Sequence, residues 1–243
     1  MSTPLVCTNV KRRRFVTACA ALGSTAGLVR LADGWAAESP HLYERSRLVD
    51  AHGEPIKVRR LTARTNYVFN YPYAATPCFL LDLGRPVAGA DHLLRADGAA
   101  YAWSGGVGAG RSVVAFSAIC AHKLAYPTRE VSFIRFQAIR SPTSDGNVIH
   151  CCADHSVYDP AAGARVMSGP APQPLAAILL DYDAARDELT ALGTVGAEQF
   201  DAFFRKYDFK LALDYGSGKA RAPVGNSSVV RELTEYCRQT IQC

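Results

Sequence analysis

The sequence has no long apolar run and little net charge beyond its first residues. The apolar stretch at 16–29 has 14 residues and is followed by Arg30. A helix of that length spans about 21 Å, short of the roughly 30 Å hydrocarbon core of a bilayer. Residues 1–37 carry +4 of the chain's net charge of +5, so residues 38–243 are nearly neutral. A nearly neutral body excludes nucleic-acid binding as the main function, because that binding needs a basic surface.

Cysteine is also scarce, and the eight present are too few for a small disulfide scaffold. Charged residues make up 20% and hydrophobic residues 49%, which excludes wholesale disorder. The sequence has no internal repeat and no long low-complexity tract. The 13 Pro and 19 Gly, spread among short apolar runs, favour strands and loops over a helical bundle. The length of 243 residues fits one ordinary domain with appendages.

The N-terminus predicts an export signal. Basic residues at 11–14 precede the short apolar stretch, and small residues follow near 34–37, as in a secretory signal. The pair Arg12-Arg13 is similar to a twin-arginine signal, so we expect export of the folded protein to the periplasm. Two alternatives stay open: an uncleaved leader that anchors the protein in the membrane, and an ordinary basic tail.

The body predicts an all-β fold followed by a partly helical C-terminal extension. Its apolar runs are short and separated by Gly, Pro and Ser, which is typical of strands. The strands that we expect lie at 55–61, 66–73, 78–83, 99–103, 112–119, 131–139, 148–152, 175–181 and 188–192. Residues 38–60 are polar and are expected to follow the surface. Apolar spacings of three and four predict a helix at 200–207 and a C-terminal helix at 229–241.

Two short motifs carry the candidate chemistry. The first is a C-x-H from Cys120 to His122, and the second is a C-x-x-H from Cys152 to His155. Each motif follows an expected strand, so two loops can turn these side chains toward a common point. Two thiolates and two imidazoles form a ligand set for either zinc or an iron–sulfur cluster.

A third element distinguishes between these two metals. Residues 169–175 read Gly-Pro-Ala-Pro-Gln-Pro-Leu and begin fourteen residues after His155. With this element, the sequence from Ala115 to Leu175 resembles the Rieske iron–sulfur family, in which C-x-H and C-x-x-H loops bind the cluster and a Gly-Pro-Ala-Pro loop covers it. Residues 156–159, Ser-Val-Tyr-Asp, are similar to the segment that follows the second loop in the family.

The resemblance implies one Rieske-type [2Fe–2S] cluster per chain. Carried over to this sequence, Cys120 and Cys152 bind one iron, and His122 and His155 bind the other. Neutral imidazoles in place of two thiolates raise the potential into the range of roughly −150 to +300 mV. The residues that the resemblance places around the cluster are Lys123, Asp154, Ser156, Tyr158, Gly169, Pro170, Ala171 and Pro172.

The second motif departs from the family in its spacing. The family's Ser and Tyr follow the ligand His by two and four residues, whereas Ser156 and Tyr158 follow His155 by one and three. A one-residue deletion is the simplest explanation. Cys151 lies beside Cys152, and neighbours in a strand face opposite sides. We assign Cys152 as the ligand, because it has the C-x-x-H spacing, and Cys151 as a packed thiol.

Other positions around the motifs differ as well. The high-potential branch of the family has a disulfide between the two cluster loops, and here Ala125 and Asp154 occupy its positions. Asp154 also brings a negative charge that lowers the potential, which Lys123 opposes. The 29 residues between the motifs are a long insertion, so we expect the hairpin at 131–152 to be a partner surface. Cys237 and Cys243 could form a disulfide with each other or with Cys78, and the sequence does not decide between these pairings.

We therefore expect a signal or anchor at 1–37, a Rieske domain at 38–195 with its cluster subdomain at about 115–175, and an extension at 196–243. The expected function is one-electron transfer between a larger redox subunit or cytochrome and a downstream carrier, similar to the small Rieske subunit of arsenite oxidase. The alternative is the quinol-oxidising Rieske subunit of a cytochrome bc-type complex. A structural zinc module is a further alternative. We find no substrate-converting site in the sequence, and we expect its 243 residues to be too few for an added oxygenase domain.

Overall fold

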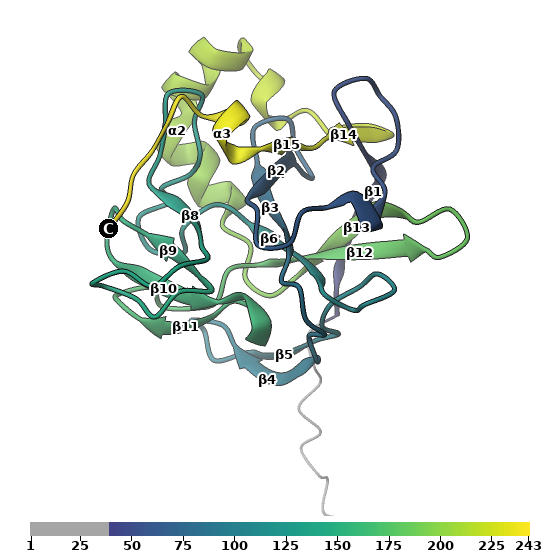
Figure 1. Cartoon of the computed structure of the whole chain (residues 1–243). Helices are drawn as coiled ribbons and strands as arrows, with labels where there is room; N and C mark the ends of the chain where they lie inside the picture. The colour runs from purple at the N-terminus through teal and green to yellow at the C-terminus, as the bar shows by residue number, and fades with distance from the viewer. Residues whose placement is uncertain (1–38) are drawn as a thin grey trace, which may run out of the picture. The chain divides into compact units, whose positions relative to one another are not determined.

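The computed structural model describes residues 39–243, and the predictions for the leader lie outside the described residues. Most of this part is antiparallel β-structure (Figure 1). The strands are β1 (His41–Val49), β2 (Tyr67–Asn70), β3 (Pro77–Asp82), β4 (Ala90–Leu94), β5 (Ala100–Trp103), β6 (Val113–Ser117), β7 (Val131–Ser132), β8 (Ile134–Gln137), β9 (Val148–Cys151), β10 (Ser156–Asp159), β11 (Arg165–Ser168), β12 (Ala177–Asp183), β13 (Glu188–Val195), β14 (Ser227–Val229), β15 (Arg231–Glu232) and β16 (Gln239–Thr240). The helices are α2 (Phe200–Tyr215) and α3 (Leu233–Tyr236). The expected fold class is confirmed.

A large sheet forms the base of the fold. Its order is β14-β1-β13-β12-β6-β3-β2-β15, and only the β1–β14 pair in it is parallel. The central strands β3 and β6 are buried along almost their whole length, which explains their continuous apolar sequences. Ser228 of β14 donates its hydroxyl to the carbonyl of Asn70 on β2, at 2.7 Å. The two ends of the sheet therefore meet, and the sheet closes on itself.

A second, smaller sheet carries the candidate loops. Its order is β11-β10-β9-β8, and all its pairs are antiparallel. It lies beside the large sheet, with β4 and β5 below both in the view of Figure 1. Three loops leave these sheets, which we call loop 1 (118–130, between β6 and β7), loop 2 (152–155, between β9 and β10) and loop 3 (169–176, between β11 and β12). Loops 1 and 2 hold the two sequence motifs, and loop 3 holds the proline-rich element.

The C-terminal extension is built into the sheets rather than appended to them. β14 pairs with β1, β15 with β2, and β16 with β7. The helix α2 is longer than predicted and buries four apolar side chains, Phe200, Phe203, Phe204 and Leu211. None of the helices in residues 39–243 is long and apolar enough to cross a membrane.

Three local predictions were wrong. The expected helix at 229–241 is instead two short strands and a single turn of helix, because open sheet edges offer partners to this backbone. The expected strand at 55–61 contains an isolated bridge and a short 3₁₀ turn, Val58–Arg60. Residues 41–49, placed within a polar surface segment, form β1 between β13 and β14.

Candidate metal centre

The three loops are fastened to one another by short contacts. The backbone N–H of Ala121 in loop 1 donates to Tyr158 Oη on β10, at 3.2 Å. The N–H of Ala171 in loop 3 donates to Ser156 Oγ, at 3.1 Å. Gly169 has a φ of +90°, and a Cβ there would lie 2.5 Å from the carbonyl oxygen of His155. Loop 3 therefore packs backbone against backbone on loop 2, which only glycine permits at this position.

Three donor side chains converge where loop 1 meets the end of β9 and loop 2, and a fourth, His122, contacts one of them. The ligand atoms of Cys120, Cys151 and Asp154 all lie within 4.8 Å of one another. Asp154 Oδ2 is 3.3 Å from Cys120 Sγ and 3.0 Å from His122 Nδ1. Both cysteines are 0% exposed, and the Asp154 side chain is 2% exposed, whereas that of His122 is 35% exposed. The site thus offers two buried sulfurs, one buried carboxylate and one imidazole at the solvent edge.

The structure corrects the choice between the adjacent cysteines. Cys151 ends β9 in phase with Ile149, so both side chains enter the main core, together with Cys120. Cys152 faces the other side, where it forms a disulfide with Cys243. A disulfide sulfur is not a thiolate, so Cys152 is not available as a metal ligand. The alternation along the strand was anticipated, and it places Cys151 beside Cys120 rather than the Cys152 that was chosen for its spacing to His155.

His155 also lies away from Cys120. Its ring is 6.0 Å from that of His150, measured between ring centroids, and its donor atoms group with His150 and Cys243. Its φ is +60°, a left-handed conformation in which the loop turns. Asp154, one residue earlier, is the side chain that faces the two thiols. The predicted pair of histidines is therefore not brought together in this structure.

If Cys151 and Asp154 take the places of Cys152 and His155 in the second motif, no one-residue deletion before Ser156 is needed. Cys151 and Asp154 are three residues apart, as the C-x-x-H motif requires of its first and last members. Ser156 and Tyr158 then follow the last member by two and four residues, which is the spacing expected from the resemblance. The sequence contained this signal, but the presence of a histidine next to Asp154 concealed it.

Hydrogen bonds stabilise the charged forms of two candidate metal ligands, Cys120 and Asp154. The pKa of Cys120 is lowered to about 7, chiefly by the hydrogen bond from the Cys151 thiol and also by that from Tyr158. The same contact raises the pKa of Cys151. Burial would raise the pKa of Asp154, but hydrogen bonds from Ser156 N and the two thiols outweigh it and hold the pKa below its usual value. Metal binding requires deprotonated ligands, so the lowered pKa values of Cys120 and Asp154 favour it, whereas the raised pKa of Cys151 opposes it.

The other predicted residues around the site have distinct placements. Tyr158 is fully buried, and its Oη lies 3.3 Å from Cys120 Sγ. Because this oxygen accepts from Ala121 N, its own proton is free to be donated to the sulfur. Pro170 and Pro172 are exposed on loop 3. Lys123 is exposed on loop 1, where its carbonyl accepts from Lys206 of α2.

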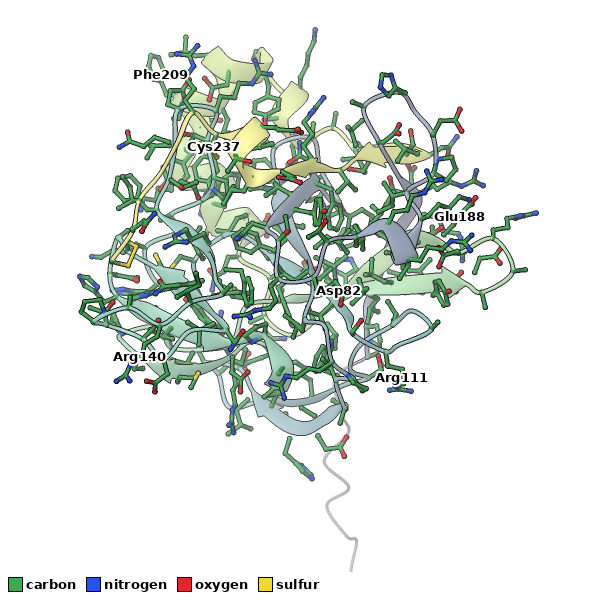
Figure 2. The ribbon with its side chains drawn as sticks, in the orientation of Figure 1. Asp82, Arg111, Arg140, Glu188, Phe209 and Cys237 are labelled. Carbon is green, nitrogen blue, oxygen red and sulfur yellow. A yellow bond between two sulfur atoms is a disulfide. The ribbon has the colours of Figure 1, made fainter. Side chains whose placement is uncertain are left out.

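A disulfide that sequence analysis left unassigned fastens the end of the chain to loop 2. Cys152 and Cys243 are 91 positions apart, and Figure 2 shows their bond in yellow at the edge of the molecule. The last residues pass alongside β7, and Arg135 Nε donates to Ile241 O at 3.1 Å. Cys78 and Cys237 are buried free thiols, so neither forms a disulfide.

The donor set fits a metal centre, with one change from expectation. Two adjacent buried sulfurs are suited to one iron of a [2Fe–2S] cluster, and an imidazole with a carboxylate is a known kind of iron ligation. The set contains one imidazole where the resemblance implies two. Cys120, Cys151 and Asp154, whose ligand atoms lie within 4.8 Å of one another, also suit a single zinc ion.

Comparison with known proteins gives a limited match. No family model matches the sequence. A solved structure, the soluble domain of the Rieske protein II (soxF) from Sulfolobus acidocaldarius, is 27% identical to this chain, with a TM-score of 0.46. The match covers 63% of this chain and 78% of that one.

Proposed function

We propose that this protein transfers single electrons through a [2Fe–2S] cluster bound between loops 1 and 2, as a member of the Rieske family. The observation that carries the proposal is the meeting of two buried thiols, Cys120 of loop 1 and Cys151 at the end of β9, with the His122 imidazole at the solvent edge. The third loop, with its Gly-Pro-Ala-Pro sequence, packs directly on loop 2. The cluster would supply the one-electron redox change.

The chain's own residues hold and tune this centre. Cys120 and Cys151 would bind one iron from a site closed to water, and His122 Nδ1 points inward to bind the other. Tyr158 Oη donates to Cys120 Sγ, which stabilises negative charge on the sulfur and so favours the reduced state. The partly exposed ring of His122 gives a partner a short route to the centre.

The setting that we propose is the periplasm, with export through a twin-arginine signal. The protein would act as a redox subunit that relays electrons between a larger oxidoreductase or cytochrome and a downstream carrier. The basic pair and short apolar run of the leader support this setting, because the twin-arginine route exports proteins that have folded around a cluster. The quinol-oxidising subunit of a cytochrome bc-type complex remains the alternative, and it needs the leader as an anchor.

An anaerobic reductive titration of the purified protein tests the function. We expect one electron taken up per chain, reversible bleaching of the visible absorption, and two irons with two acid-labile sulfides. A colourless protein that takes up no electron would overturn the proposal. A midpoint in the upper part of the Rieske range would favour quinol oxidation over relay from a partner enzyme.

A second candidate is a mononuclear zinc module. One observation favours it: Asp154 Oδ2 lies close to both His122 Nδ1 and Cys120 Sγ, as donors to a single tetrahedral ion do. This candidate predicts one zinc per chain and no redox activity. It gives no role to the exposed edge of His122 or to the proline-rich loop.

A further inference from the structure

We infer that Asp154, and not a second histidine, is the fourth ligand of the centre, so that one iron is held by an imidazole and a carboxylate. This inference rests on the proposed function and goes beyond it, because it changes the ligand set implied by the resemblance. The juxtaposition that carries it is the approach of Asp154 Oδ2 to both His122 and Cys120.

The carboxylate of Asp154 is held in place by its own loop. Its Oδ1 accepts from the backbone N–H of Ser156, at 3.0 Å, and this bond directs Oδ2 toward the two motif side chains of loop 1. A carboxylate with a 2% exposed side chain is rare unless a cation or several donors satisfy it. Ser156 N satisfies Oδ1, and Cys120 Sγ and His122 Nδ1 lie within hydrogen-bond distance of Oδ2. A metal ion shared with His122 would take the place of these contacts at Oδ2.

Loop 2 is fixed in the register that selects Asp154. The Cys152–Cys243 disulfide holds Cys152 on the outer face, which leaves Cys151 on the inner face beside Cys120. Gly169 packs against the carbonyl of His155 and so restricts movement of the loop from the other side. Bringing the His155 ring to Cys120 would require the loop to turn over between these two constraints.

A carboxylate in place of an imidazole changes the charge of the centre. The cluster would carry one more negative charge than one with two thiolates and two neutral imidazoles, and one fewer than one with four thiolates. Each added negative charge disfavours reduction, so the midpoint potential should lie between those of the two classes. The number of histidine nitrogens bound to iron should be one.

The test is a count of iron-bound histidine nitrogens in the reduced full-length protein, grown with ¹⁵N-labelled histidine, by pulsed EPR. We expect one coupled histidine nitrogen in the wild-type protein. Asp154→His should add a second nitrogen and raise the midpoint potential. Asp154→Asn, of nearly the same shape, should lose most of the bound iron while circular dichroism shows the fold retained. His155→Gln is the matched control and should leave the nitrogen count, iron content and midpoint unchanged.

The outcomes separate this inference from the proposed function. Two coupled nitrogens in the wild-type protein, or loss of one in His155→Gln, would overturn the inference and leave electron transfer standing. Full iron content and an unchanged signal in Asp154→Asn would also overturn it. Absence of any iron–sulfur signal from the wild-type protein would overturn the proposed function itself. If Asp154→His does not assemble a centre, the wild-type nitrogen count decides alone.

Discussion

The disulfide between Cys152 and Cys243 joins loop 2 to the end of the chain and gives two neighbouring cysteines different roles. Cys152 is bonded on the outer face, whereas Cys151 is buried beside Cys120 on the inner face. Among the described residues no disulfide joins loop 1 to loop 2. The bond between Cys152 and Cys243 also makes the roles of the two neighbouring cysteines separable by experiment.

Serine substitution of each neighbouring cysteine should give opposite results. Cys151→Ser should lose the bound metal, because a serine oxygen is a poor substitute for a thiolate ligand. Cys152→Ser should keep the metal and lose only the disulfide. Metal content per chain and the visible spectrum distinguish the two variants. Retention of the metal in Cys151→Ser together with its loss in Cys152→Ser would restore the assignment that the C-x-x-H spacing suggested.

Loss of the disulfide should lower stability without removing the site. A bond that closes a loop of 91 residues restricts the unfolded chain, and its removal is expected to cost about 2–4 kcal/mol of unfolding free energy. Denaturant unfolding of Cys243→Ser measures this cost. The double variant Cys152→Ser/Cys243→Ser should be no less stable than Cys243→Ser alone. A reductant should lower the unfolding free energy of the wild-type protein and leave that of Cys243→Ser unchanged. An unchanged unfolding free energy of the wild-type protein in reductant would show that the bond does not form.

Tyr158→Phe should lower the midpoint potential of the centre. The variant removes the hydroxyl that lies 3.3 Å from Cys120 Sγ and keeps the buried ring. A lost hydrogen bond of about 1.4 kcal/mol in differential strength corresponds to ~59 mV for one electron, so we expect a decrease of tens of millivolts. Tyr182→Phe is the control, because that hydroxyl binds Asp187 far along the chain from the motifs. Equal midpoints for Tyr158→Phe and wild type would contradict a contact between hydroxyl and ligand.

Gly169→Ala should disturb the cover that loop 3 forms over loop 2. An added methyl group would lie 2.5 Å from the carbonyl oxygen of His155 and 2.6 Å from Cα of Ser156, so backbone must move. We expect a loss of about 1–3 kcal/mol in unfolding free energy and faster loss of metal to a chelator. Gly98→Ala is the matched control, since Gly98 also has a positive φ, +83°, but open space around it. Similar chelator rates in the two variants would show that the packing of loop 3 does not protect the site.

Much of the fold was predictable because strand patterns in this sequence are local. The apolar runs that became β3 and β6, and the final hairpin of β12 and β13, were recognised from composition and turns alone. The C-terminal segment was not, since Val229 and its neighbours satisfy a helical spacing equally well. Their backbone is strand because β1 and β2 leave open edges beside it, and such long-range pairing leaves no local signal.

The meeting of the two motifs was predictable, whereas the side chains of the second motif that face the first were not. The order of the three motif elements predicted that loops 1 and 2 meet, and Cys120 and His122 of loop 1 do contact Asp154 of loop 2. The choice of Cys152 and His155 followed the residue types of the second motif. In the structure Cys152 instead forms a disulfide with Cys243, 91 positions away, and the spacing of residues within the motif gives no sign of this bond.

Native mass spectrometry of the purified protein is the direct test of whether the chain binds a [2Fe–2S] cluster through Cys151, because it measures the mass of the folded chain together with its bound metal and sulfide. We expect a mass increase equal to two irons and two sulfides per chain, which is lost in Cys151→Ser and retained in Cys152→Ser. A single zinc per chain, or a chain that carries no metal after anaerobic purification, would contradict this expectation.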